Sequence, residues 1–283
     1  MVRGNKRYGI AAGAVLGIVA LAGVVAMQVR EQRPAAAASN ETPRTADGKP
    51  DLSGRWGGGG GGGRRPVLDE DGVLRIGGNY RKGNPTNGER DSGLEQRFGP
   101  SFPLYKPEHW DRVDYLDNHG NVEDSAFHCM PAGVPRIGPP IKIMQTPTEL
   151  VFMYQARNTW RVIPVDGRPH DPVNSQDQTF LGDSIGRWEG DTLVVDVVGF
   201  NETSWIGWPG YFHSSDMRVE ERLRREGNTL IYQARVHDPE VLQEPWVMPE
   251  RRLNLNTSPR ITYIEDPPCV ETDSANLTTR ERG

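Results

Sequence analysis

The sequence predicts an all-β protein, an antiparallel up-and-down meander of short strands. Three observations support this prediction. Apolar residues alternate with a period of two in many short segments, as in half-buried strands. Turns rich in glycine and proline separate these segments, and the chain of 283 residues holds 33 glycines and 23 prolines. No segment between the later strands has helical periodicity, which argues against parallel βαβ units.

The clearest element is a hairpin within residues 182–201. Ile185–Glu189 is predicted as a short strand, and Thr192–Val198 as a longer strand of mostly β-branched residues. Gly190 lies in the turn between them, where a tight hairpin needs a positive φ.

The same pattern of strand, turn and strand runs along the rest of the chain. Pro107–Asp117 is the exception and predicts one helical turn, with Trp110 and Tyr115 facing the core. The predicted strands are 51–56, 73–76, 141–145, 149–155, 159–165, 185–189, 192–198, 217–224, 229–237, 246–255 and 260–264.

Such a meander must protect its edge strands. Closure into a lipocalin-like barrel does this, and a two-sheet β-sandwich is the alternative. A barrel of about eight strands has an interior wide enough for side chains or for one small ligand.

The first 30 residues are predicted to be a signal peptide or an N-terminal membrane anchor. Arg3, Lys6 and Arg7 precede an uncharged apolar run over residues 9–27, which is the order found in export signals. The run is just long enough to span a bilayer, which favours an uncleaved anchor. The protein is therefore expected to be exported, periplasmic or extracellular, with the membrane contacted only through this segment.

Three further regions complete the predicted organisation. Residues 31–48 are rich in Ala, Pro and Thr and are predicted as a linker. Residues 49–283 are predicted as a single β domain, with an irregular N-terminal part. Seven consecutive glycines at 57–63 are interpreted as a flexible insertion, because no helix pattern follows them as a phosphate-binding loop requires.

The two cysteines, Cys129 and Cys269, are 140 positions apart. An even count in an exported chain predicts one disulfide, which ties the C-terminal tail to the start of the core. The net charge of −5 offers no basic surface for nucleic acid, so no nucleic-acid partner is expected.

Long motifs around the central hairpin resemble those of a group of exported bacterial proteins known by these motifs rather than by a function. The resemblance implies export and a β-rich fold, and it implies no particular chemistry. The matching pieces are Ala46–Trp56, Pro131–Arg136, Asp166–His170, Gly182–Asn201, His213–Ser214 and Val219–Arg222.

Two of the six histidines are candidates for acid–base chemistry. His170 and His213 lie in predicted loops on either side of the central hairpin. Their imidazoles are expected to approach Asp183 if these loops meet at one mouth of the barrel. The alternative is that both histidines make ordinary hydrogen bonds in turns. No His-x-His or His-Glu-x-x-His pattern is present, so no metal and no cofactor are predicted.

A strand with a period of two also predicts an inward-facing carboxylate at Glu221, which shares a face with Met217, Val219 and Leu223. Asp196 lies similarly between valines. A buried carboxylate needs a partner, and Arg187 or Arg161 is the expected one. The pair is either structural or, if it lines a cavity, part of a site in which Arg187 or Glu221 holds developing charge.

Aromatic residues gather in the loop after the central hairpin. Trp205, Trp208, Tyr211 and Phe212 form either a hydrophobic plug at the barrel end or an aromatic wall for a ligand, and Trp188 is a further ligand-binding candidate.

The leading functional prediction is an exported protein that binds a small, partly apolar molecule. The alternative is an enzyme with cofactor-independent acid–base chemistry, such as a lyase, isomerase or hydrolase, acting on a small-molecule substrate through the loop histidines and a carboxylate. A structural envelope protein is the third possibility.

Overall fold

The computed structural model of the protein describes residues 41–57, 67–68, 74–75, 102–173, 175–207, 210–259 and 269. The chain divides into two units, residues 1–39 and 40–283, and all described residues belong to the second. The predicted signal peptide or anchor, most of the glycine run and the predicted strand 260–264 lie outside the described residues. Within the described part, no helix has the length and apolar character needed to cross a membrane.

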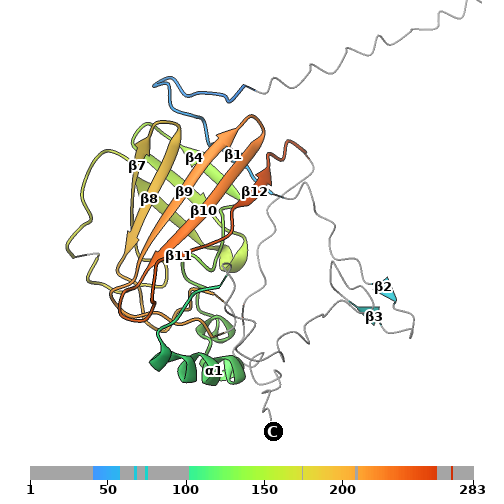
Figure 1. The fold of residues 1–283 in the computed structure, drawn as a ribbon. Coiled ribbons are helices and arrows are strands. Elements are labelled where there is room, and N and C mark those ends of the chain that lie inside the picture. Colours follow the sequence, from blue (N-terminus) through green and yellow to red (C-terminus); the bar gives the residue numbers. More distant parts are fainter. Residues whose placement is uncertain are drawn as a thin grey trace, which may run out of the picture. The chain divides into compact units, whose positions relative to one another are not determined.

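The all-β prediction is confirmed, because the strands form antiparallel sheets (Figure 1). A four-stranded sheet has the order β1-β4-β5-β6, and a six-stranded sheet has the order β11-β10-β9-β8-β7 with β12 also paired to β10. The four-stranded sheet contains β1 (Gly54–Arg55), β4 (Lys142–Gln145), β5 (Glu149–Met153) and β6 (Trp160–Pro164). The six-stranded sheet contains β7 (Asp183–Glu189), β8 (Thr192–Val198), β9 (Arg218–Glu226), β10 (Thr229–His237), β11 (Trp246–Val247) and β12 (Arg251–Asn254). A separate pair joins β2 (Val67–Leu68) to β3 (Leu74–Arg75).

The described residues do not form the closed barrel that the sequence led us to expect, and the sandwich alternative describes them. β6 and β7 end their sheets without pairing to each other. A tight hairpin turn would let β6 and β7 pair and close a barrel. The long loop 165–182 lies between them instead. At the opposite edge the sheets are joined by one bridge between Trp56 and Leu255, supported by a 2.8 Å bond from Asn256 N to Arg55 O.

The central hairpin is present as predicted. β7 and β8 pair from Asp183 opposite Val198 to Glu189 opposite Thr192. Gly190 in the turn has a φ of +60°, the left-handed conformation that the turn requires.

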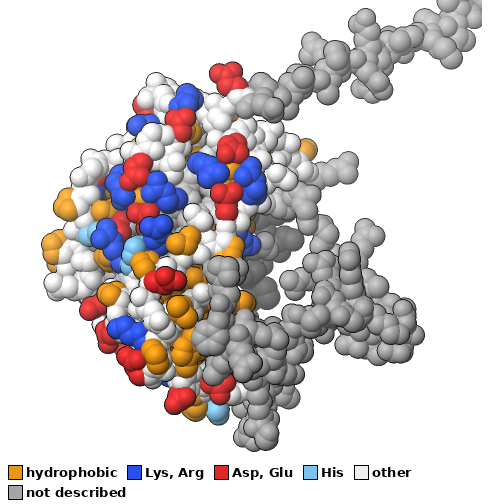
Figure 2. Space-filling view, viewed as in Figure 1, with side chains coloured by type: hydrophobic (Ala, Val, Ile, Leu, Met, Phe, Trp, Pro, Cys, Tyr) orange, Lys and Arg blue, Asp and Glu red, His pale blue; other side chains and the backbone are white. Residues whose placement is uncertain are grey.

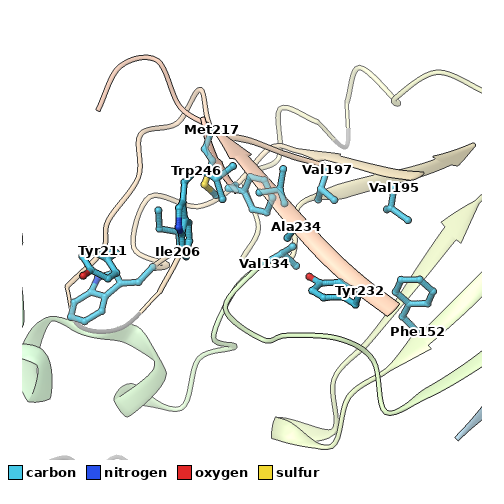
Figure 3. Packing of buried hydrophobic residues seen from close by; sticks show 14 of the residues in the cluster. Val134, Phe152, Val195, Val197, Ile206, Tyr211, Met217, Tyr232, Ala234 and Trp246 are labelled. Carbon is cyan, nitrogen blue, oxygen red and sulfur yellow. The ribbon is translucent and has the colours of Figure 1, made fainter. Parts of the chain in front are cut away.

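Alternate residues of the two sheets point toward each other and form the core. Phe152 of β5 and Tyr232 of β10 come together from opposite sheets in Figure 3. Val195 and Val197 of β8 lie on the same inner face, as the two-residue period dictates. The interior of the sandwich is therefore filled with side chains.

Short helices cover one end of the sheets: η3 (Pro107–His109), α1 (Trp110–Asn118), α2 (Gly120–Glu123) and η4 (Ser125–His128), with η5 (Ala156–Asn158) between β5 and β6. The predicted helical turn is thus longer than expected. Trp110 packs against the core, but the expectation that Tyr115 faces inward is wrong, because its side chain is 49% exposed. Val113 and Leu116 form the buried side of α1, and Tyr115 lies away from it.

The predicted disulfide between Cys129 and Cys269 is confirmed, with a Cα–Cα distance of 5.5 Å. Such bonds are typical of proteins in oxidising compartments.

The last residues of the predicted linker contact the sheets. Arg44 forms an ion pair with Asp191 at 2.7 Å, and Thr42 donates a hydrogen bond to Arg225 O.

Candidate functional site

His170 and Asp183, two of the predicted site residues, are in direct contact. His170 lies in the loop after β6, and its Nδ1 is 2.7 Å from Asp183 Oδ2 at the start of β7. Its Nε2 is 3.0 Å from Asp196 Oδ2 on β8. A neutral imidazole has one N–H group, so both contacts are hydrogen bonds only when the ring is an imidazolium. The two carboxylates therefore hold one histidine and attach the loop to the sheet.

Asp196 is the centre of this cluster. Arg218 on β9 donates to both of its oxygens. Burial acts to raise the pKa of Asp196, but the hydrogen bonds from Arg218 and His170 outweigh it and lower the pKa. Asp196 lies on the outer side of β8, opposite Val195 and Val197 of the core, and so it does not enter the sandwich interior.

His213 lies in a different cluster from His170. Its side chain is buried, its Nδ1 is 2.7 Å from Ser214 O and its Nε2 is 2.8 Å from Ser204 Oγ. Because a carbonyl oxygen only accepts, Nδ1 carries the proton and Nε2 accepts from Ser204. Burial lowers the pKa of His213. The two histidines have no hydrogen-bond partner in common among the described residues, and Ser204 is itself buried.

Glu221 is fully buried, as its position in the strand predicted, and Arg161 is its partner. Arg161 Nη2 on β6 donates to Glu221 Oε2 at 2.7 Å, across the interior of the sandwich. Tyr232 donates to the other carboxylate oxygen at 2.9 Å. Ser184 and Tyr154 accept from the same guanidinium. Burial acts to lower the pKa of Arg161, but the Glu221 carboxylate raises it above its ordinary value.

Arg187 is not part of this buried pair. It lies on the outer face of the six-stranded sheet, in a ring of alternating charges with Glu189, Arg222 and Glu220. A second ring consists of Arg224, Glu226, Arg252 and Glu250. Figure 2 shows the two groups of blue and red side chains over this sheet. Both signs are balanced within each ring, so neither ring attracts an ion of one sign.

The aromatic loop packs inward. Trp205, Tyr211 and Phe212 are buried, and Tyr105 donates from its hydroxyl to Phe212 O. The guanidinium carbon of Arg112 on α1 is 4.0 Å from the centre of the Phe212 ring. These side chains fill the end of the core beside α1. Trp208 lies outside the described residues.

Trp188 is only partly buried and packs against the edge of the core. Lys49 Nζ lies 5.9 Å from the centre of its ring.

A hollow of about 430 Å³ lies where β1, β4 and the chain after β12 meet. Arg55 and Lys142 face each other directly across β1 and β4 in this hollow. Its lining residues are Ser53, Gly54, Arg55, Lys142, Leu255, Asn256 and Thr257. Arg55 Nη2 donates to Ser258 O at 2.6 Å. Sequence reasoning missed this site, because its cations come from strands far apart in the chain and no local motif links them.

Next to the hollow, the outer face of the four-stranded sheet exposes several apolar side chains. Met144, Trp160 and Val162 are 42%, 62% and 41% exposed. The sequence shows that alternate side chains of β4, β5 and β6 lie on opposite faces of the sheet. Which of these two faces is buried depends on where the six-stranded sheet packs.

No group of three His, Cys, Asp or Glu side chains in the described part of the chain is arranged to hold a metal ion. Family models, curated proteins and solved structures contain no match to this chain.

Proposed function

We propose that this protein is an exported binding protein for a small, partly apolar molecule. The observation that supports the proposal best is the hollow of about 430 Å³ where β1, β4 and the chain after β12 meet, which is lined by apolar and polar side chains together. Small-molecule sites commonly have volumes of about 300–1,000 Å³.

The lining offers a ligand both apolar contact and hydrogen-bond donors. Leu255 supplies an apolar side chain, and Arg55 and Lys142 supply charged donors. Arg55 also donates to Ser258 O at 2.6 Å, which fixes its guanidinium beside the hollow. Ser53, Asn256 and Thr257 add polar side chains to the lining that can orient the ligand.

Export is supported by two independent features. The N-terminal order of positive charge followed by an apolar run is typical of exported proteins. The Cys129–Cys269 disulfide is the kind of bond that persists in an oxidising compartment.

The test is to identify what the protein carries. The full chain is purified from its native envelope under non-denaturing conditions, and native mass spectrometry records bound small molecules. We expect a bound small molecule on the wild-type protein, with occupancy reduced about tenfold by Lys142→Gln or Arg55→Gln, because each removes a charged donor from the lining of the hollow.

Lys49→Gln is the matched control, since Lys49 does not line the hollow. Equal occupancy in all four proteins contradicts the hollow as the site. Absence of any bound species, together with no thermal shift from a panel of partly apolar small molecules, contradicts the binding function.

A second candidate function is acid–base catalysis at His170. It is supported by the contacts of its imidazole with Asp183 and Asp196, and by the nearby Arg218, whose side chain is 57% exposed. An imidazole held by carboxylates is a common proton-transfer group. Among the described residues, Glu221, Arg187 and His213 form no hydrogen bond or ion pair with His170, Asp183, Asp196 or Arg218, and they are not assigned roles in this cluster.

The test of this candidate is turnover of a substrate panel by wild type and His170→Gln, with His128→Gln as the control. Loss of turnover of about 100-fold or more in His170→Gln alone is expected. Equal rates in the three proteins exclude His170 as the catalytic group.

A further inference from the structure

We infer that β6 is an interaction edge at which a second copy of this chain binds. The two β6 strands pair antiparallel about a two-fold axis at Val162, so that the two four-stranded sheets become one continuous sheet. The inference goes beyond the proposed binding function and does not depend on the hollow.

The open side of β6 has backbone groups that are available for pairing. On the other side, Tyr154 N donates to Thr159 O at 2.8 Å in the ladder with β5. Hydrogen-bonded pairs alternate along an antiparallel ladder, so Trp160 and Val162 direct their N–H and C=O groups away from β5. β6 is the last strand of its sheet, and in the described part of the chain these groups have no backbone partner.

The exposed side chains of the same strand are apolar. Trp160 and Val162 are 62% and 41% exposed, and Pro164 follows them on the same face. The one charged residue of β6, Arg161, faces the interior and is paired with Glu221. Natural proteins commonly protect a free sheet edge with charged side chains. The exposed face of β6 has none, so this edge is suited to pairing.

The loop that follows β6 turns toward the other sheet. His170 contacts Asp183 of β7 and Asp196 of β8. The loop is thereby held on the outer side of the six-stranded sheet, and Val162 keeps 41% of its surface exposed. A second strand can therefore approach the long side of β6.

The edge favours a second copy over an unrelated extended segment. A peptide that adds one strand leaves its own far edge unpaired. Two copies of β6 cover both open edges at once. A residue on a two-fold axis meets itself, and like charges directly opposite destabilise a sheet. Val162 has no charge, and β-branched side chains suit a strand.

The buried face of the sheet selects the register. An axis at Arg161 would place this guanidinium opposite its own copy, which is unfavourable. An axis at Val162 places Arg161 opposite Ile163 of the second copy. In that register the two Val162 residues exchange hydrogen bonds, and Trp160 N–H donates to Pro164 O of the second copy. Pro164 has no N–H group, and here it needs only to accept.

The test uses full chains with one added cysteine, which are oxidised mildly in the native envelope and separated on a non-reducing gel. The two native cysteines are bonded to each other. The Cα atoms of the two residues at position 162 are expected about 5.5 Å apart, a distance that a disulfide spans. Val162→Cys should therefore give a covalent dimer. Trp160→Cys should not, because the two residues at position 160 are about 14 Å apart.

Met144→Cys is the matched control. Met144 is 42% exposed, against 41% for Val162, but it lies on β4, two strands from the edge. Sedimentation of the purified full chain over a range of concentrations supplies a second measurement. Val162→Lys places like charges opposite each other and is expected to weaken dimerisation at least about tenfold. Met144→Lys is expected to leave it unchanged, and circular dichroism verifies that each variant is folded.

Each contrary outcome overturns a stated part of the inference. A wild-type protein that stays monomeric at every concentration, with no covalent dimer of Val162→Cys, overturns the whole. A covalent dimer of Met144→Cys without one of Val162→Cys shows contact through the face of the sheet instead. A dimer of Trp160→Cys alone overturns the register. A covalent bond from Val162→Cys to a different protein, without a dimer, replaces the second copy by a strand of that protein.

Discussion

Arg161 of β6 and Glu221 of β9 form an ion pair inside the sandwich, with 2.7 Å between Nη2 and Oε2 and both side chains almost completely buried. The pair links the two sheets through their centre. Ser184, Tyr154 and Tyr232 supply the remaining hydrogen bonds of the two charged groups. Because the pair is almost completely buried, it joins the faces of β6 and β9 that point into the core.

Removing only one member of this ion pair is expected to lower the free energy of unfolding strongly. Glu221→Leu leaves the Arg161 guanidinium buried without its carboxylate, which is predicted to lower the free energy of unfolding by about 3–5 kcal/mol. The double variant Arg161→Met/Glu221→Leu removes both charges and is predicted to recover part of this loss. Urea denaturation measures both variants. A double variant that is no more stable than Glu221→Leu contradicts this view.

The pKa of His213 predicts how stability depends on pH. Burial holds this pKa below its ordinary value of 6.5. Below about pH 6.5 the unfolded chain therefore binds a proton that the folded protein does not, so the free energy of unfolding falls as the pH drops toward the folded-state pKa. His213→Gln is expected to reduce this slope in urea denaturation between pH 7 and 5. His237, whose pKa burial also lowers, is expected to contribute to the slope that remains. An unchanged slope contradicts the prediction.

A second pH effect is expected from Asp196. Its pKa is lowered from 3.8, because Arg218 and His170 outweigh the opposing effect of burial. The resulting stability is present above about pH 4 and is lost as the pH falls through the folded-state pKa. Arg218→Gln is predicted to cost at most about 1 kcal/mol at pH 7, since Arg218 is largely exposed. The variant should lose less stability than wild type between pH 4 and 2, and equal losses would refute the assignment.

Two glycines with positive φ provide a matched pair of substitutions. A Cβ at Gly190 has no atom within 4 Å, whereas a Cβ at Gly199 is 2.7 Å from Ser175 O. Gly190→Ala is predicted to lower the free energy of unfolding by about 1 kcal/mol, because it introduces backbone strain alone. Gly199→Ala adds a clash with backbone and is predicted to cost at least about 1–3 kcal/mol more. Thermal unfolding compares them, and equal costs contradict the close approach at Gly199.

The disulfide is predicted to stabilise the domain substantially. It closes a loop of 140 residues, for which loop-closure entropy gives about 5 kcal/mol. Cys129→Ser/Cys269→Ser should lower the free energy of unfolding by that amount under oxidising conditions. The same measurement with a reducing agent is the control, in which wild type and variant should agree. A variant as stable as the oxidised protein contradicts the prediction.

The strands were predictable from the sequence because the alternation of apolar and polar residues, and the glycines and prolines of the turns, can be read within each short segment. The β7–β8 hairpin, its turn at Gly190 and the inward position of Glu221 all follow from the two-residue period. Both His170 and His213 were expected to approach Asp183 at a barrel mouth, and only His170 contacts it. The cysteine count predicted the disulfide, because an exported chain with two cysteines has one way to pair them.

Only the tertiary structure decided which faces and edges meet. Nothing local distinguishes Arg161 from Arg187 as the partner of Glu221, because the choice depends on which sheet covers β9. The path of the loops places His213 and His170 in different clusters. It also leaves β6 and β7 unpaired with each other. The hollow between Arg55 and Lys142 brings together strands separated by more than eighty positions, and a pairing over such a distance leaves no periodic signal in either segment.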